Sequence, residues 1–198
     1  MKKILSLVAI ISIVSFGCST KSKTAYEKID KESKYAEEFK NAPEWVLNPS
    51  SVSKFAAVGS AKIGKAGLNF ARTEALANAR DELARQIQVK VKNLVGNFVQ
   101  TTGAGSQETV DKITRTVSKQ ITNQVLIGSR QKDIWISPKN ELFVLVVLDK
   151  DAAKKLAKYI EDTIVTSYKN NQALWQQFQA KRGFEELDKE IQKEFYGY

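Results

Sequence analysis

The sequence predicts an α+β fold: a small antiparallel sheet of about three strands packed against a long amphipathic helix, with further C-terminal helices. Three observations lead to this prediction. Apolar residues recur every three or four positions through residues 68–100, which is the period of a helix. Two apolar runs, at 123–136 and 141–149, flank the turn-forming segment SPKN and are typical of a β-hairpin. Residues 150–195 then return to helical spacing.

The first elements are a short strand at 55–62 (FAAVGSAK) and the long helix at 68–100, separated by Gly64 and Gly67. The helix carries one apolar face, which we expect to be core rather than a ligand site. That face consists of Leu68, Ala71, Ala75, Ala79, Leu83, Ile87, Val91, Leu94 and Phe98. Its alanines allow a close approach to a sheet.

A second helix follows the flexible TTGAGS segment, with Ser106 and Thr109 as candidate caps, and is expected to end near Gln120. The hairpin comes next, and its second strand is a continuous apolar run over 142–148. Such a run predicts a central strand that is covered on both faces. Asp149 or Asp151 caps the next helix, and a last aromatic-rich helical stretch from 173 has a weak point at Gly183.

The N-terminus has the order of a secretory signal. Lys2 and Lys3 precede an apolar stretch at 4–16, which is interrupted only by serines. A membrane-spanning helix needs about 20 residues, so this stretch is too short to cross a bilayer but suits the apolar region of a signal. Gly17 and then Cys18, the one cysteine of the chain, come directly after it.

The segment Ser15-Phe16-Gly17-Cys18 resembles the lipobox of bacterial lipoproteins, which is cut before a cysteine that is then acylated. Gly17 and Cys18 match that pattern, whereas Ser15 and Phe16 depart from its usual leucine and small residue. We therefore predict a signal peptide at 1–17, a lipidated N-terminus and tether at 18–42, and a folded domain at 43–198. The alternative is an incidental cysteine beside a conventionally cleaved signal.

Several chemistries are excluded by residue content. The chain has no histidine and one cysteine, so it cannot form an intrachain disulfide or a zinc site from these ligands. It lacks GxSxG and a phosphate-binding glycine loop. The adjacent pairs Glu37/Glu38 and Glu185/Glu186 diverge by about 100° on a helix, and we expect them to be solvated. We predict no enzyme activity, no catalytic residue, no cofactor and no metal.

The chain is basic, with a net charge of +9. Removal of residues 1–17 takes away Lys2 and Lys3 and no acidic residue, which leaves +7. The lysines are dispersed and no RNA-binding signature accompanies them, so we expect no nucleic-acid partner. Attraction to acidic lipids or anionic envelope polymers and simple solubility remain alternative uses of this charge.

Four segments, PEWVLNP, AAVGSAK, ARTEALANARDELARQI and LWQQFQAKRGFEELDKE, resemble the Lpp-twenty family of bacterial outer-membrane lipoproteins, which is related to the flagellar FlgP group. The best marker is the helix that carries Ala71, Arg72, Glu74, Ala75, Ala79 and Arg80. The resemblance implies a long helix on an antiparallel sheet, no catalysis, and envelope roles that include ring-like assembly around the flagellar motor. It supplies no active site.

Two function classes therefore stay open. The first is a structural or interaction lipoprotein, held in membrane lipid by acylated Cys18, that self-associates or docks on an envelope protein. The second is a binding module for an anionic ligand, such as a cell-wall polymer, a lipid headgroup or a host surface. Ser19 follows the cysteine in place of the aspartate that retains enteric lipoproteins in the inner membrane, which favours the outer membrane.

Overall fold

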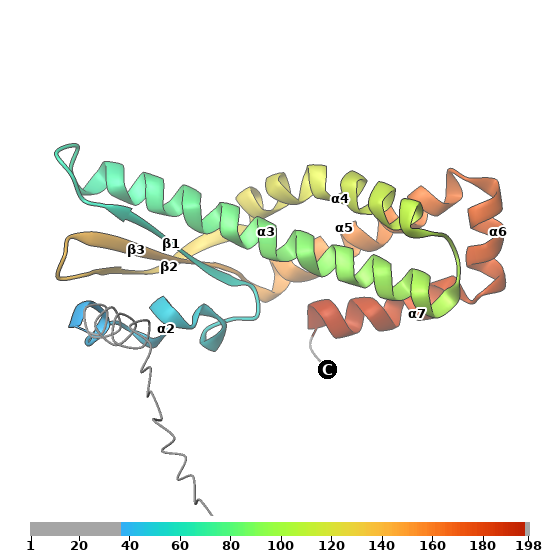
Figure 1. The fold of residues 1–198 in the computed structure, drawn as a ribbon, viewed down its shortest axis with the longest axis horizontal. Coiled ribbons are helices and arrows are strands. Elements are labelled where there is room, and N and C mark those ends of the chain that lie inside the picture. Colours follow the sequence, from blue (N-terminus) through green and yellow to red (C-terminus); the bar gives the residue numbers. More distant parts are fainter. Residues whose placement is uncertain (1–36, 197–198) are drawn as a thin grey trace, which may run out of the picture. The chain divides into compact units, whose positions relative to one another are not determined.

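The computed structural model describes residues 37–196, and Figure 1 shows their arrangement. A short helical turn at 37–39 opens this part. The N-terminal half continues with α2 (Glu44–Leu47), η1 (Pro49–Ser51), β1 (Ala56–Lys62), α3 (Leu68–Thr102) and α4 (Gln107–Gly128). The remainder comprises β2 (Ser129–Ile136), β3 (Glu141–Leu148), α5 (Lys150–Lys169), α6 (Gln172–Ala180), α7 (Gly183–Ile191) and the π-helical η2 (Gln192–Tyr196).

The three strands form one antiparallel sheet in the order β1-β3-β2. The apolar strand β3 is central, as predicted, and its side chains alternate between two cores. Leu142, Val144 and Val146 belong to the core beneath α3, whereas Phe143 and Leu145 face Trp45 and Val46 of α2. The predicted α+β fold, with a three-stranded sheet against a long helix, is confirmed.

Helix α3 lies directly against β1, where Gly59 permits contact between the two backbones. A Cβ atom at Gly59 would lie 2.9 Å from Cα of Ala79, and closer still to the Ala75 carbonyl oxygen and the Ala79 amide nitrogen. Ala71, Ala75 and Ala79 are completely buried along this seam. The predicted apolar face of α3 is core, apart from Leu68, which is 45% exposed.

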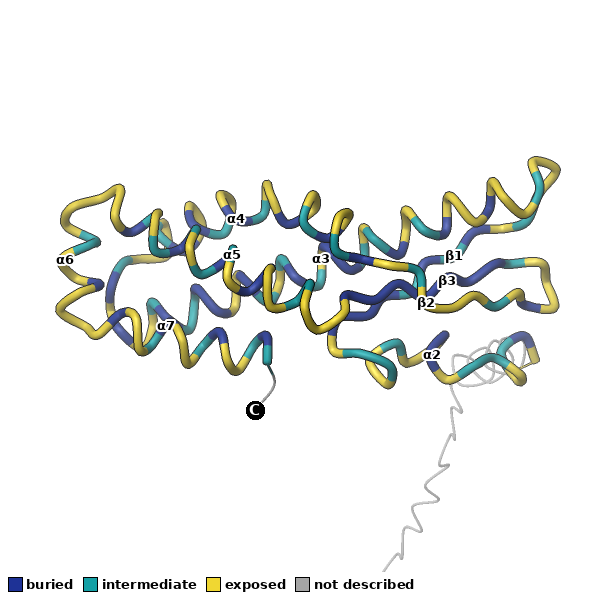
Figure 2. The backbone as a smooth tube through the Cα atoms, turned by 180° about the vertical axis from the view of Figure 1, so that it is seen from behind, coloured by how far each residue is buried: buried dark blue, intermediate teal, exposed yellow. Residues whose placement is uncertain are grey.

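The half of α3 beyond the sheet packs with the C-terminal helices (Figures 1 and 2). Phe98, Tyr168 and Phe178 meet at ring-centroid distances of 5.1–5.6 Å and are fully buried. Asp149 caps α5, because its carboxylate accepts a hydrogen bond of 3.0 Å from the Ala152 amide. The predicted weak point separates α6 from α7, with Arg182 at a φ of 54° immediately before Gly183.

Two boundaries differ from the sequence predictions. Helix α4 continues to Gly128, so residues 123–128 are helical and not part of the hairpin as predicted. The reason is that Val117, Ile121 and Val125 continue one buried helical face past Gln120. The packed unit also begins at Glu38, so residues 38–42 belong to it although the sequence places them in the tether.

Candidate functional site

The predicted anchor, Cys18, lies outside the described residues, so its acylation stays a prediction. The structure instead shows where the segment that leads from Cys18 joins the packed unit. Phe39 lies against the hairpin, with its ring centroid 6.1 Å from that of Trp135 and 5.7 Å from that of Phe143. Among the described helices, none is long and apolar enough to cross a bilayer.

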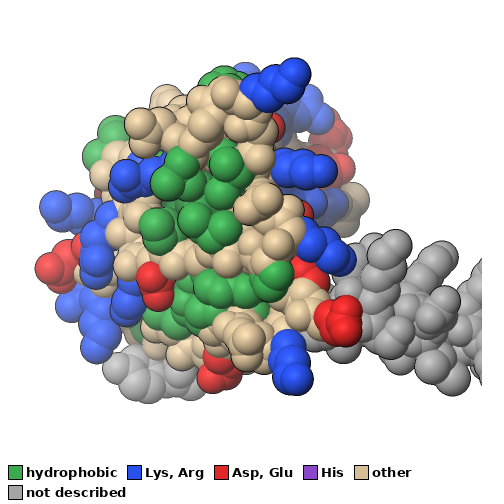
Figure 3. Space-filling model, turned by 90° about the vertical axis from the view of Figure 1, so that its left-hand side faces the viewer, with side chains coloured by type: hydrophobic (Ala, Val, Ile, Leu, Met, Phe, Trp, Pro, Cys, Tyr) green, Lys and Arg blue, Asp and Glu red, His purple; other side chains and the backbone are tan. Residues whose placement is uncertain are grey.

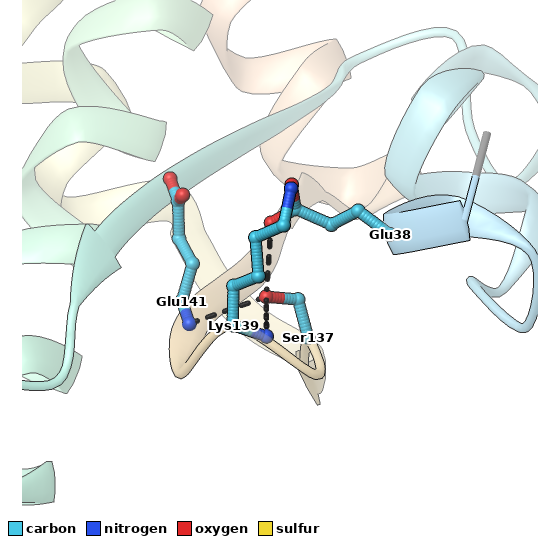
Figure 4. A network of polar contacts seen from close by, with 4 residues as sticks. All are labelled: Glu38, Ser137, Lys139 and Glu141. Carbon is cyan, nitrogen blue, oxygen red and sulfur yellow. Dashed lines mark hydrogen bonds and ion pairs between the residues drawn. The ribbon is translucent and has the colours of Figure 1, made fainter. Parts of the chain in front are cut away.

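A polar network around the β2–β3 turn holds Glu38, the first residue of the packed unit, against the hairpin (Figure 4). The carboxylate of Glu38 accepts hydrogen bonds from Lys139 Nζ at 2.8 Å and from Ser137 Oγ at 3.2 Å. Ser137 Oγ in turn accepts from the backbone amides of Lys139 and Glu141 at 3.3 and 3.2 Å. Asn140, at a φ of 59°, completes the turn. One glutamate thus ties the start of the packed unit to the tip of the hairpin.

Glu38 is 8% exposed, so the prediction that Glu37 and Glu38 form a solvated pair is wrong for Glu38 and holds for the exposed Glu37. The hydrogen bond from Lys139 is the main cause that lowers the pKa of Glu38 below its ordinary value of 4.5, and Ser137 adds to it. A carboxylate held ionised in this way is a structural anchor and not a general acid.

A basic cleft of about 700 Å³ lies at the opposite end of the sheet from the hairpin turn. It is enclosed by the segment before β1, by β2 and the end of β3, by the start of α5, and by η2. Its charged lining consists of five cations and one acid: Lys54, Arg130, Lys132, Lys150, Lys154 and Asp149. The stacked rings of Phe55 and Phe195, with centroids 5.5 Å apart, supply an apolar wall.

The charges of this cleft are only partly neutralised. Arg130 Nε lies 3.8 Å from Asp149 Oδ2, and the other carboxylate oxygen of Asp149 is occupied by the cap of α5. Lys54 Nζ donates a 3.2 Å hydrogen bond to the Lys193 carbonyl oxygen, and burial lowers the pKa of Lys54, with the neighbouring charge of Lys90 adding to the effect. The cleft therefore suits an anionic ligand by charge and by hydrogen-bond donors.

Sequence reasoning missed this cleft because its cations come from segments far apart in the chain, and no spacing connects them. A second cavity, of about 470 Å³, lies between α4 and the α5–α6 turn and has a mixed lining that includes Glu108, Lys112 and Asn171. Across residues 37–196, no three acidic, histidine or cysteine side chains are grouped as metal ligands. The sequence predicted no catalytic or metal residue, and it therefore placed none in either cavity.

Comparison with protein-family sequence profiles matches residues 43–149 to the LPP20 lipoprotein family. The chain belongs to this family. The match begins just before α2 and ends at the residue that caps α5, so it spans the whole sheet together with α3 and α4. A search of curated proteins finds no match to the chain.

Family membership identifies a membrane-anchored lipoprotein of the cell envelope. The motifs that carry the resemblance have structural roles in the described part of the chain: AAVGSAK is β1 with Gly59, and Ala75 and Ala79 form the opposing side of the seam. Both motifs thus contribute to the contact that joins α3 to the sheet.

Proposed function

We propose that this protein is a non-catalytic lipoprotein of the outer membrane, anchored through acylated Cys18, which acts as a structural or interaction module in an envelope assembly. The family match is the observation that carries this proposal. The packing of residues 38–42 on the hairpin adds support, because it gives the segment from the anchor a fixed point of attachment. Several acyl chains on one cysteine hold a protein durably, since each buried CH₂ contributes about 0.8 kcal/mol.

The test is metabolic labelling with palmitate followed by membrane fractionation. The wild type should incorporate label and fractionate with the outer membrane, and Cys18→Ala should do neither. Equal labelling of the two proteins would refute the anchor. Light scattering on the protein without acyl chains separates the open alternatives, because an assembly component should be a homo-oligomer and a simple ligand-binding module a monomer.

The basic cleft favours a second candidate function, the binding of an anionic envelope polymer. Lys132 and Lys154 are exposed in the cleft, and reversing both charges with Lys132→Glu and Lys154→Glu should weaken retention on purified cell wall roughly tenfold. Salt should weaken the retention of the wild type in the same direction. The matched control reverses two charges at exposed positions of α4, with Arg115→Glu and Lys119→Glu. Equal losses in both proteins would exclude the cleft as the site.

A further inference from the structure

The end of the sheet that carries the hairpin turn exposes large apolar side chains. Leu68, Ile134 and Ile136, which we term the hairpin-end surface, are 45%, 42% and 43% exposed. Phe70, in the first turn of α3, is 61% exposed. Figure 3 views the molecule from this end and shows hydrophobic side chains gathered at its centre, with both basic and acidic side chains around them. Single exposed apolar residues are ordinary, but such a gathering indicates an interaction surface.

The strand register explains why these side chains are uncovered. Ile134 and Ile136 pair with Val144 and Leu142, so they lie on the face of the sheet that α3 covers. Helix α3 packs mainly on β1 and β3, and two of its arginine side chains extend to β2. Arg72 Nε donates to Gln131 Oε1 at 2.9 Å, and Arg80 Nε donates to Ser129 Oγ at 3.3 Å. Ile134 and Ile136, on edge strand β2 near the hairpin turn, therefore remain exposed to solvent.

The backbone of this edge is protected against a further strand. A bulge interrupts the pairing of β2 between Gln131 and Asp133, and Lys132 is exposed there. The carboxylate of Asp133 accepts a 2.8 Å hydrogen bond from the Ile134 amide, which occupies that donor. Bulges and lysines are devices that prevent edge-to-edge association. The surface thus exposes apolar side chains, while edge strand β2 is protected against pairing with a strand of a second copy.

The place where the chain from Cys18 enters the packed unit indicates which partner the hairpin-end surface contacts. The packed unit starts at Glu38, on the hairpin turn itself, so the segment from Cys18 arrives at this end. A chain of the length of residues 18–37 spans at most about 70 Å, and about 25 Å on average when flexible. Anchoring at Cys18 would therefore place the hairpin end, where the chain enters the packed unit, within reach of the bilayer.

Three lysines of this end are available to an acidic membrane. Lys40, Lys62 and Lys65 are exposed and make no ion pair within residues 37–196. Of the nearby acids, Glu38 is paired with Lys139 and Glu141 accepts a hydrogen bond from Ser60, whereas Glu37 and Asp133 are exposed. Lysines beside exposed isoleucine and leucine are the composition of surfaces that rest in the interface of anionic bilayers.

We propose that the hairpin-end surface docks on the anionic headgroup layer of the membrane, with Leu68, Ile134 and Ile136 entering the interface and Lys62 and Lys65 facing lipid phosphates. The inference rests on the membrane anchor proposed above and adds an orientation to it. Because β3 is eight residues long, the basic cleft at the other end of the sheet lies about 25 Å further from the bilayer and stays open to the periplasm or the exterior.

The orientation is tested on the acylated full-length protein in vesicles that contain phosphatidylglycerol. A thiol-reactive, environment-sensitive fluorophore is placed at Ile134→Cys and, as a control, at Ile127→Cys, which is 81% exposed at the end of α4. Spin-labelled lipids should quench the label at position 134 and shift its emission to the blue, with neither effect at position 127. A blue shift without quenching would mean that protein covers the surface, and it would overturn the proposal, as would equal quenching at both positions.

A second measurement separates this inference from the anchor. Labelling of the wild type by the fluorophore would show that Cys18 carries a free thiol and that the anchor proposal is wrong. In a Cys18→Ala background, flotation with phosphatidylglycerol vesicles should still exceed flotation with phosphatidylcholine vesicles. The pair Ile134→Ser and Ile136→Ser should lower that flotation about tenfold, and Ile127→Ser should leave it unchanged. Equal flotation of all three proteins would refute docking even if acylation is confirmed.

Discussion

Replacement of Gly59 by alanine tests the seam between α3 and β1 most severely. The added methyl group would lie 2.9 Å from Cα of Ala79 and would also collide with the Ala75 carbonyl oxygen and the Ala79 amide nitrogen. These atoms belong to a helix backbone and cannot rotate away, so α3 must move off the sheet or the strand must bend. Overpacking of a close-packed core costs about 1–3 kcal/mol, and a rigid neighbour places Gly59→Ala at the upper end, near 3 kcal/mol.

Gly96→Ala provides the matched control on the same helix. A Cβ atom at Gly96 meets no atom within 4 Å, and its φ lies outside the left-handed range, so the substitution should stabilise the protein by about 0.5–1 kcal/mol through helix propensity. Chemical and thermal unfolding followed by circular dichroism measures both variants. A domain of this size shifts by about 2–4 °C per kcal/mol, so Gly59→Ala should melt about 6–12 °C lower. Unchanged melting of Gly59→Ala, or equal losses in both variants, would refute the close backbone contact.

Three further substitutions have defined outcomes in the same unfolding assays. Tyr168 is fully buried and donates a 2.7 Å hydrogen bond to the Ala104 carbonyl oxygen, so Tyr168→Phe should cost about 1–2 kcal/mol at neutral pH. Burial raises the pKa of Tyr168 to about 12, so its contribution is complete below pH 10 and is lost between pH 10 and 12; the phenylalanine variant should lack that loss. Asp149→Ala removes the cap of α5 and should cost about 1 kcal/mol, whereas Asp151→Ala, two residues later in the first turn of the helix, should cost less. Because the pKa of Glu38 is lowered, Glu38→Gln should be less stable than the wild type above pH 4.5, and the difference should shrink as the pH falls; a constant difference would contradict the ionised network.

The sequence was sufficient for elements with a regular local signal. The spacing of buried residues in α3 and the continuous apolar run of β3 each have one structural solution, so the helix-on-sheet arrangement could be derived from them. The end of α4 could not be placed, since Val125, Leu126 and Ile127 form a contiguous apolar run that suits a strand and a helix equally well. Packing of Val125 in line with Ile121 decided for the helix.

The candidate sites were harder to predict than the fold. Glu38 appeared solvated because its partners, Ser137 and Lys139, are about a hundred residues away in the chain. The basic cleft likewise depends on side chains that only the folded chain brings together. Cys18 is the opposite case, since its predicted role is derived from local sequence order and lies outside the described residues.

The most direct test of the account is the mass of the N-terminal peptide from protein purified out of the membrane fraction. We expect a mature chain that begins at Cys18, without residues 1–17 and with the added mass of fatty acyl chains that include palmitate. An unmodified Cys18 thiol, or a mature N-terminus located after Cys18, would contradict the lipid anchor and the membrane orientation that depends on it.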